Sequence, residues 1–217
     1  AEQQMVLELR PAHDPRKTYG FAGVVISLED LSANIFTWYR EGGQWKAKKT
    51  ITIPAQPATE DELPPLLKGF KAVPPLVTDI DLSLDDRFLY VSCWGTGELH
   101  QYDVSDPFNP VLTGKIEIGG VARKKGHPQH EGALLGGPQM VEVSRDGRRV
   151  YLTLSAGVRR VEVPRVVGAS ERDAEFKLRQ TGLILGDVFY DYSNYYPNGV
   201  VSAQGVIAGD TLTEKSP

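Results

Sequence analysis

Four histidines are the residues of this chain best suited to binding a metal. His13 is the strongest candidate, because an imidazole suits copper and the neighbouring Asp14 can fix the second ring nitrogen. The structural alternative is a histidine that caps a tight turn before Pro15. We therefore take His13 as the first candidate metal ligand.

His127 and His130 form a second candidate metal-binding pair in a long loop, residues 119–138. Their spacing would place both rings on one face of a helix, but Pro128 disfavours a helix there. No His-Glu-x-x-His motif or cysteine cluster strengthens a metal site in this sequence. His100 alternates with its neighbours in an expected strand, so we predict that it faces solvent and is structural.

Cys93 is the one cysteine of the chain, which excludes an internal disulfide and a cysteine-cluster metal site. A reactive thiol needs a cationic neighbour or a helix N-terminus, and the sequence shows neither beside Cys93. We expect a buried, unreactive thiol. A single thiol is compatible with a reducing compartment and a cytoplasmic location. A periplasmic location stays open, because the N-terminus of a longer parent chain would not be visible here.

Acidic and glycine-rich segments have structural interpretations. We expect Asp79 and Asp81 to alternate outward along one strand, and residues 85–86 to form a turn, rather than to make a pair of catalytic carboxylates. The run 136–140 lacks the lysine and the serine or threonine of a phosphate-binding loop. We expect it to allow a close approach of backbones. No Gly-x-Ser-x-Gly motif for nucleophilic catalysis is present.

The composition excludes several classes of protein. The 217 residues are 41% hydrophobic and 24% charged, which excludes a collagen, a coiled coil and a chain disordered throughout. The formal net charge of −4 argues against a nucleic-acid partner. No apolar run approaches the roughly 20 residues of a membrane helix. This length allows one or two domains, and one is enough for an all-β chain.

An internal repeat predicts the elements that would position these residues. Residues 79–92 align with residues 140–153, at an offset of 61 residues. In each copy, apolar and polar residues alternate as in a half-buried strand, and a turn and a second strand follow. We therefore expect two hairpins, with turns at residues 85–86 and 146–147.

Further strands extend the repeat into four-stranded units. Residues 98–104 and 112–118 complete the unit around the first hairpin, and a weaker unit lies upstream, with strands at 20–27, 34–39 and 49–54. Such units are typical of β-propeller blades, so we predict an all-β fold of about three blades. A β-sandwich is the alternative, although it does not predict the repeated hairpin.

Three long segments resemble one protein family. They are LELRPAHDPRKTYGFAG, DIDLSLDDRFLYVSCWGTGELHQYDVSDPFNPVLTGKIEIGG and GGPQMVEVSRDGRRVYLT. These segments closely resemble the selenium-binding protein family, which includes methanethiol oxidases, and the resemblance runs from about Leu7 to about Ser155. It implies part of a seven-bladed propeller. It also implies copper-dependent oxidation of methanethiol to formaldehyde, hydrogen sulfide and hydrogen peroxide, an association with selenium, and a histidine at the position of His13.

Two departures from the family bear on the organisation of the chain. Family members are about twice as long, and the match ends where residues 154–158 replace the family's continuation. We therefore divide the chain into a propeller portion, residues 1–155, and a tail, residues 156–217, which resembles nothing familiar. We interpret the tail as loops and further strands, with a turn at residues 198–199.

Three functions remain open from the sequence. The chain is a copper-dependent oxidoreductase acting on a small thiol, a non-enzymatic module that binds a selenium species, a small ligand or a protein, or a partial chain without activity of its own. Fold alone does not choose between them. Because about three blades cannot close a ring, we also expect the open blade edges to be covered by the tail, by self-association or by a larger assembly.

Overall fold

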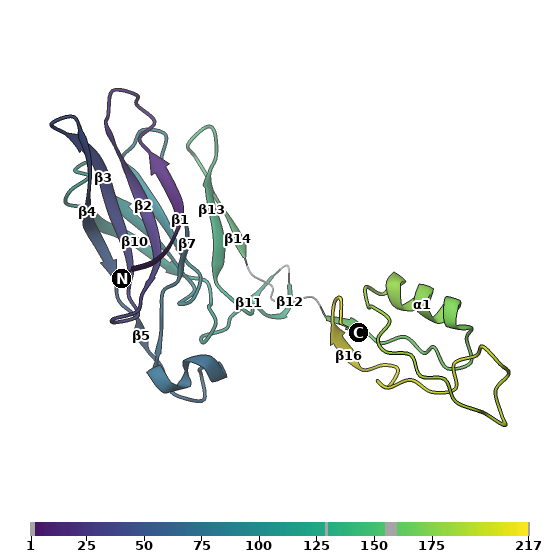
Figure 1. Ribbon diagram of the computed structural model, residues 1–217. Coiled ribbons are helices and arrows are strands. Elements are labelled where there is room, and N and C mark those ends of the chain that lie inside the picture. The colour runs from purple at the N-terminus through teal and green to yellow at the C-terminus, as the bar shows by residue number, and fades with distance from the viewer. Residues whose placement is uncertain (1–2, 129, 155–159, 217) are drawn as a thin grey trace. The chain divides into compact units, whose positions relative to one another are not determined.

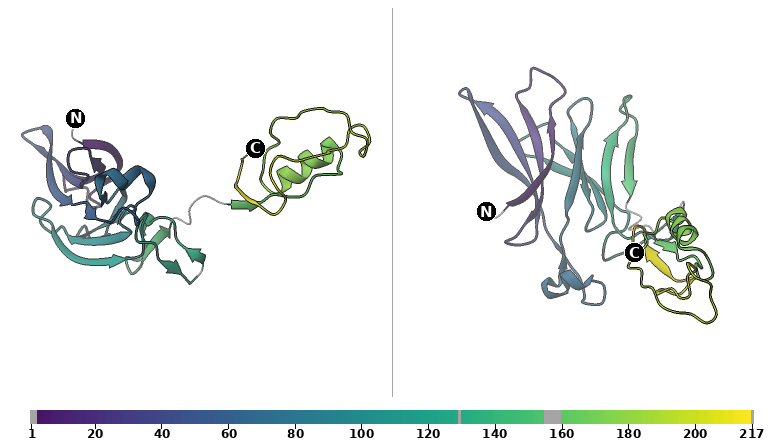
Figure 2. Two further views of the ribbon diagram at one scale, coloured as in Figure 1. Left: turned by 90° about the horizontal axis from the view of Figure 1, so that it is seen from below. Right: turned by 45° about the vertical axis from the view of Figure 1, so that its right-hand side comes forward.

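The structure is a computed structural model that describes residues 3–128, 130–154 and 160–216. The chain divides into two compact units, residues 1–157 and residues 158–217. Figures 1 and 2 colour the first unit from purple to green and the second from green to yellow. In these described ranges, no helix is both long enough and apolar enough to span a membrane.

The first unit begins with an antiparallel sheet of four sequential strands (Figure 1). Its strands are β1 (Gln3–Pro11), β2 (Tyr19–Ser27), β3 (Ala33–Glu41) and β4 (Gln44–Ile53). Gly42 and Gly43 form the turn between β3 and β4, and both have positive φ, of 58° and 81°. A two-residue hairpin of matching twist requires this conformation. The three strands predicted upstream of the repeat are confirmed.

A second four-stranded antiparallel sheet contains the first copy of the repeat. Its strands are β7 (Val77–Leu82), β8 (Phe88–Cys93), β9 (Glu98–Asp103) and β10 (Val111–Glu117). The core lies between the two sheets, where apolar side chains of β2, β3 and β4 meet those of β7, β8 and β9. Phe21, Ile35, Ile80 and Leu89 are all fully buried there. This shared core fixes the second sheet against the first.

The second copy of the repeat is a hairpin of β13 (Pro138–Val143) and β14 (Val150–Leu154). The same hydrogen bond forms in both turns: Ser83 Oγ donates to Asp85 Oδ1 over 2.6 Å, and Ser144 Oγ donates to Asp146 Oδ1 over 2.5 Å. The next residue in each turn has positive φ, 58° at residue 86 and 68° at residue 147. Both predicted hairpin turns are confirmed.

Short elements connect the sheets. They are β5 (Gln56–Pro57), β6 (Ala72–Val73), the 3-10 helix η1 (Pro65–Phe70), β11 (Gly126–His127) and β12 (His130–Ala133). Close backbone contact explains the glycine-rich run before β13. A Cβ on Gly137 would lie 2.6 Å from the Cα of Gly97 and 2.6 Å from the carbonyl oxygen of Trp94. The predicted close approach of backbones is confirmed.

Residues 160–216, the described part of the second unit, contain one helix and one small sheet. Strands β15 (Arg160–Glu162) and β16 (Thr211–Thr213) pair, and α1 (Glu171–Gln180) follows β15. Ser170 caps α1, because its side chain accepts a hydrogen bond from the backbone N–H of Asp173 over 3.2 Å. Helix α1 lies in the tail, where we expected loops and further strands.

Candidate functional site

A groove of about 420 Å³ lies where three strands of the first unit are neighbours. β7 contacts both β1 and β13, and Figures 1 and 2 show the three strands side by side. We call this the three-strand groove. Its walls include side chains from each strand and from the hairpin partner β14: Arg10, His13, Asp79, Asp81, Met140, Glu142 and Tyr151.

Asp79 and Asp81 attach β13 to β7. β13 pairs with β14 along one edge, so the amides of its other edge need acceptors. Asp79 Oδ2 accepts the N–H of Val141 over 2.8 Å, and Asp81 Oδ2 accepts the N–H of Val143 over 2.7 Å. The prediction that both aspartates point outward is wrong for Asp79, which is 1% exposed. These carboxylates take the place of a neighbouring strand.

Arg10 connects β1 to the same carboxylates. Its Nε lies 3.1 Å from Asp81 Oδ1, its Nη2 lies 3.5 Å from Asp79 Oδ1, and it also pairs with Glu8. Burial raises the pKa of Asp79, while the N–H of Val141 and the charge of Arg10 partly offset that rise. One guanidinium faces three carboxylates, so this cluster keeps a net negative charge.

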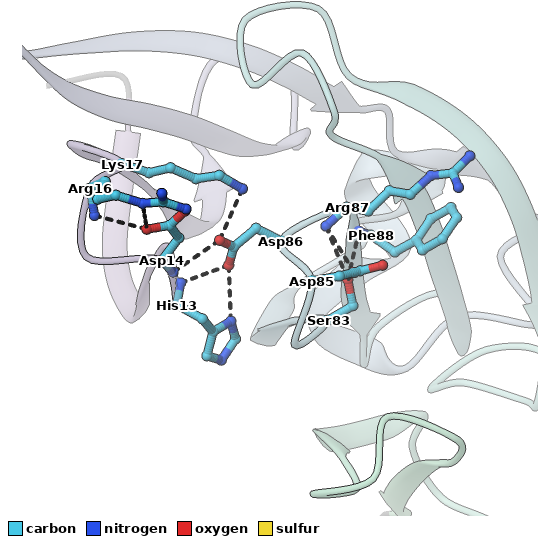
Figure 3. Close-up of polar contacts among 9 residues, drawn as sticks. All are labelled: His13, Asp14, Arg16, Lys17, Ser83, Asp85, Asp86, Arg87 and Phe88. Atoms are coloured by element: carbon cyan, nitrogen blue, oxygen red, sulfur yellow. Dashed lines mark hydrogen bonds and ion pairs between the residues drawn. The ribbon is translucent and has the colours of Figure 1, made fainter.

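His13 lies just after β1, and its side chain lines the three-strand groove. Its Nδ1 is 3.0 Å from Asp86 Oδ1, as Figure 3 shows. The carboxylate that orients the ring therefore belongs to Asp86, whereas Asp14, the neighbour predicted to do this, binds Arg16. An Nδ1–H held by a carboxylate leaves Nε2 as the nitrogen that can coordinate a metal.

Asp86 is bound by four groups at once (Figure 3). Its carboxylate accepts the N–H of His13 over 2.6 Å, the N–H of Asp14 over 3.1 Å and the ammonium of Lys17 over 3.0 Å, besides the His13 ring. Burial alone would raise the pKa of Asp86, but these donors outweigh burial and lower it. Asp86 therefore stays ionised and keeps the His13 ring in place.

The other two candidate ligands belong to the β11–β12 hairpin. His127 and His130 pair through their backbones in the β11–β12 hairpin, and His127 is absent from the walls of the groove. The side chain of His130 lies outside the described residues. Among the side chains that the structure does describe, no group of three or more His, Cys, Asp or Glu residues is placed to hold a metal.

A buried polar row lies along β9, and it corrects one prediction. His100 is 5% exposed rather than solvent-facing. Its Nε2 lies 3.0 Å from Glu98 Oε2, and its Nδ1 lies 3.2 Å from the hydroxyl of Tyr102. Burial tends to raise the pKa of Glu98, but hydrogen bonds from His100, Lys115 and Gln56 lower it to about 2. Glu98, His100 and Tyr102 can be buried on this face of β9 because their polar atoms form hydrogen bonds with one another.

Cys93 lies at the end of β8 and is fully buried, as predicted. Burial, followed by the nearby charge of Glu98, raises the pKa of its thiol. A thiol with a raised pKa and no exposure is a poor nucleophile. Cys93 therefore takes no part in the candidate chemistry.

Comparisons with known proteins match both units. The family described as 56kDa selenium binding protein covers residues 1–159, and the PASTA domain family covers residues 161–217. A methanethiol oxidase of Rattus norvegicus is 41% identical over 166 residues, covering 69% of this chain and 33% of the relative. Selenium-binding protein 2 of Mus musculus is 40% identical over the same shares. The chain thus spans about a third of the length of these relatives.

A solved structure agrees with the sequence matches. The X-ray structure of a hypothetical selenium-binding protein from Sulfolobus tokodaii has 60% sequence identity and a TM-score of 0.67, covering 71% of this chain and 33% of that one. Through residues 1–159, the chain belongs to the 56 kDa selenium-binding protein family.

Proposed function

We propose that the three-strand groove is part of the thiol-binding site of a methanethiol oxidase-type β-propeller, of which this chain supplies about three blades. The two four-stranded sheets would be complete blades and the β13–β14 hairpin part of a third. The observation that carries the proposal is the His13 imidazole, which Asp86 fixes at a groove formed by β1, β7 and β13. The relatives named methanethiol oxidase support the same reaction class.

The walls of the groove suit a small, uncharged thiol. Met140, Leu84 and Tyr151 offer apolar surface to a methyl group. The carboxylates of Asp79 and Asp81 repel a thiolate, so the substrate would enter with its proton. A volume of about 420 Å³ leaves ample room for a molecule of this size.

The described side chains do not complete a copper site. The family resemblance implies copper, and among the described side chains His13 is the one histidine that lines the groove. A copper ion in defined geometry needs several ligands. His13 would therefore serve as one copper ligand. The described residues bring no second histidine to the groove. On this account the chain alone turns thiols over poorly.

Release of hydrogen peroxide from methanethiol, with copper supplied, tests the proposal. We expect this chain to release far less peroxide than a full-length methanethiol oxidase at equal concentration, and His13→Ala to abolish what remains. Turnover comparable to the full-length relative would show that this chain holds a complete site. Residual turnover that His13→Ala leaves unchanged would exclude the three-strand groove.

A non-enzymatic role is the second candidate. One oriented imidazole above an acidic cluster is enough to hold a small ligand without turnover, and the relative named selenium-binding protein 2 favours a selenium species. Retention of selenite by the purified chain without peroxide release would favour this role. Peroxide release that requires His13 would favour the oxidase.

A further inference from the structure

The second unit contains a large groove that the proposed thiol chemistry does not use. It has a volume of about 1310 Å³ and lies between α1 and the extended segment 184–206. Figure 1 shows this segment as a long loop beside α1. Pockets for small ligands usually measure about 300–1,000 Å³. An extended ligand therefore suits this groove better than a compact one.

Exposed aromatic side chains form one wall of the groove. Phe189, Tyr190 and Tyr192 all line it and are 89%, 81% and 103% exposed. The hydroxyl of Tyr190 lies 3.1 and 3.3 Å from the two carboxylate oxygens of Glu171 on α1. Aromatic rings gathered on a surface in this way are typical of a binding site. Their faces are open to a ligand rather than packed in a core.

The charges of the groove all have one sign. Its charged lining residues are Glu171, Asp187 and Asp191, and neither a lysine nor an arginine lines it among the residues described. Aromatic faces attract cations through their quadrupoles, and carboxylates bind ammonium and guanidinium groups. The aromatic wall and the carboxylates therefore both favour a cationic ligand.

We propose that this groove binds an extended segment of a partner protein that carries lysine or arginine side chains. Their cationic ends lie over the rings of Tyr192 and Phe189 and beside the carboxylates of Asp187 and Asp191. The volume of the groove favours a peptide chain over a single small amine. This binding is independent of the three-strand groove and of thiol chemistry.

Isothermal titration of the full chain with an acetylated, amidated octapeptide of alternating lysine and serine tests this proposal. The comparison peptide has glutamate in place of lysine. Tyr192→Ala removes a ring of the groove, and its matched control is Tyr195→Ala, since Tyr195 is 93% exposed but does not line the groove. Asp187→Asn with Asp191→Asn removes two charges, and Asp210→Asn is the control outside the groove.

We expect the lysine peptide to bind and the glutamate peptide not to bind. Loss of one exposed cation–aromatic contact weakens binding about two- to fivefold, so Tyr192→Ala should raise Kd by that factor and Tyr192→Phe should restore it. The double asparagine variant should weaken binding at least as much and reduce its sensitivity to salt.

Three results would overturn the proposal. The first is absence of binding by the lysine peptide, and the second is equal binding of both peptides, which would indicate an apolar docking surface. The third is a Kd for the lysine peptide that changes equally in Tyr192→Ala and Tyr195→Ala, or equally in the double asparagine variant and Asp210→Asn. That result would place the binding outside this groove, for example on the acidic cluster around Asp79.

Discussion

Asp86 joins two loops that lie 73 residues apart in the sequence, and it orients His13 in the three-strand groove. Its positive φ of 58° is the conformation that the hairpin turn needs. Its carboxylate is 2% exposed and contacts the loop after β1. A single residue thus sets both the turn and the position of the candidate ligand.

Replacing Asp86 by asparagine should destabilise the first unit. Asparagine tolerates the positive φ, but it has one acceptor oxygen in place of two and no charge for Lys17. We expect the free energy of unfolding to fall by about 1–3 kcal/mol. Urea unfolding measures this, with Glu41→Gln as the control, because the pair of Glu41 with Lys46 is exposed and solvent screens it. Equal stability of Asp86→Asn and wild type would contradict the role given to Asp86.

Glu98 should make stability fall in acid. Its pKa is about 2 in the folded chain, below the value of about 4.3 expected when unfolded. A lowered pKa means that the stabilisation is fully present above the unfolded value and is lost as pH falls through about 4 toward 2. Urea midpoints measured from pH 7 to pH 2 should therefore decline less steeply in Glu98→Gln than in wild type. If the urea midpoints of both proteins declined identically, groups other than Glu98 would cause the loss of stability in acid.

Hydrogen bonds from side chains to backbone position the elements around the groove. β13 meets β7 through the carboxylates of Asp79 and Asp81 rather than through a backbone ladder. Each carboxylate serves a different amide, of Val141 and Val143. The attachment of the second hairpin therefore depends on two separable contacts.

Amide exchange can separate these two contacts. Asp79→Ala should accelerate hydrogen exchange at the amide of Val141 more than at that of Val143, and Asp81→Ala should do the reverse. The two variants control for each other, because a general loss of stability would accelerate both amides. An effect at neither amide would show that the β13–β14 hairpin is held by other contacts.

Gly147 should resist substitution in the turn of the second hairpin. Its φ is +68°, and an added Cβ would meet Leu84 at an ordinary 3.8 Å, so strain in the backbone is the main cost. We expect Gly147→Ala to lower the free energy of unfolding by about 1 kcal/mol, and Gly147→Asn by less. Gly126→Ala, in an open position without positive φ, is the control for chemical denaturation. Equal effects at both glycines would contradict the turn geometry.

Local patterns predicted the hairpins, and long-range contacts explain what the sequence missed. Turn residues at 85–86 and 146–147 and alternating strands are local signals, and the structure confirms both hairpins. The inward role of Asp79 depends on the amides of β13, 62 residues away, which no local pattern shows. Helix α1 did have a signal, since Ser170 precedes acidic residues in the first turn and basic residues in the last.

Across the whole molecule, the chain joins a portion that belongs to the 56 kDa selenium-binding protein family to a second unit that matches another family model. Residues 1–159 match the first family and residues 161–217 match the PASTA domain family. The first unit supplies one oriented histidine to its groove, while the second has an acidic, aromatic groove of its own. The two units therefore hold grooves of different chemistry within one chain.

Copper retention tests the proposal that the three-strand groove supplies one metal ligand, His13, and not a complete site. Purified chain is loaded with copper, dialysed against a competing chelator and analysed for bound metal, beside His13→Ala and His127→Ala. We predict that wild type binds copper weakly and loses it to the chelator, and that His13→Ala lowers the initial loading while His127→Ala does not. One tightly held copper ion per chain that survives the chelator, or loading that does not depend on His13, would contradict the claim.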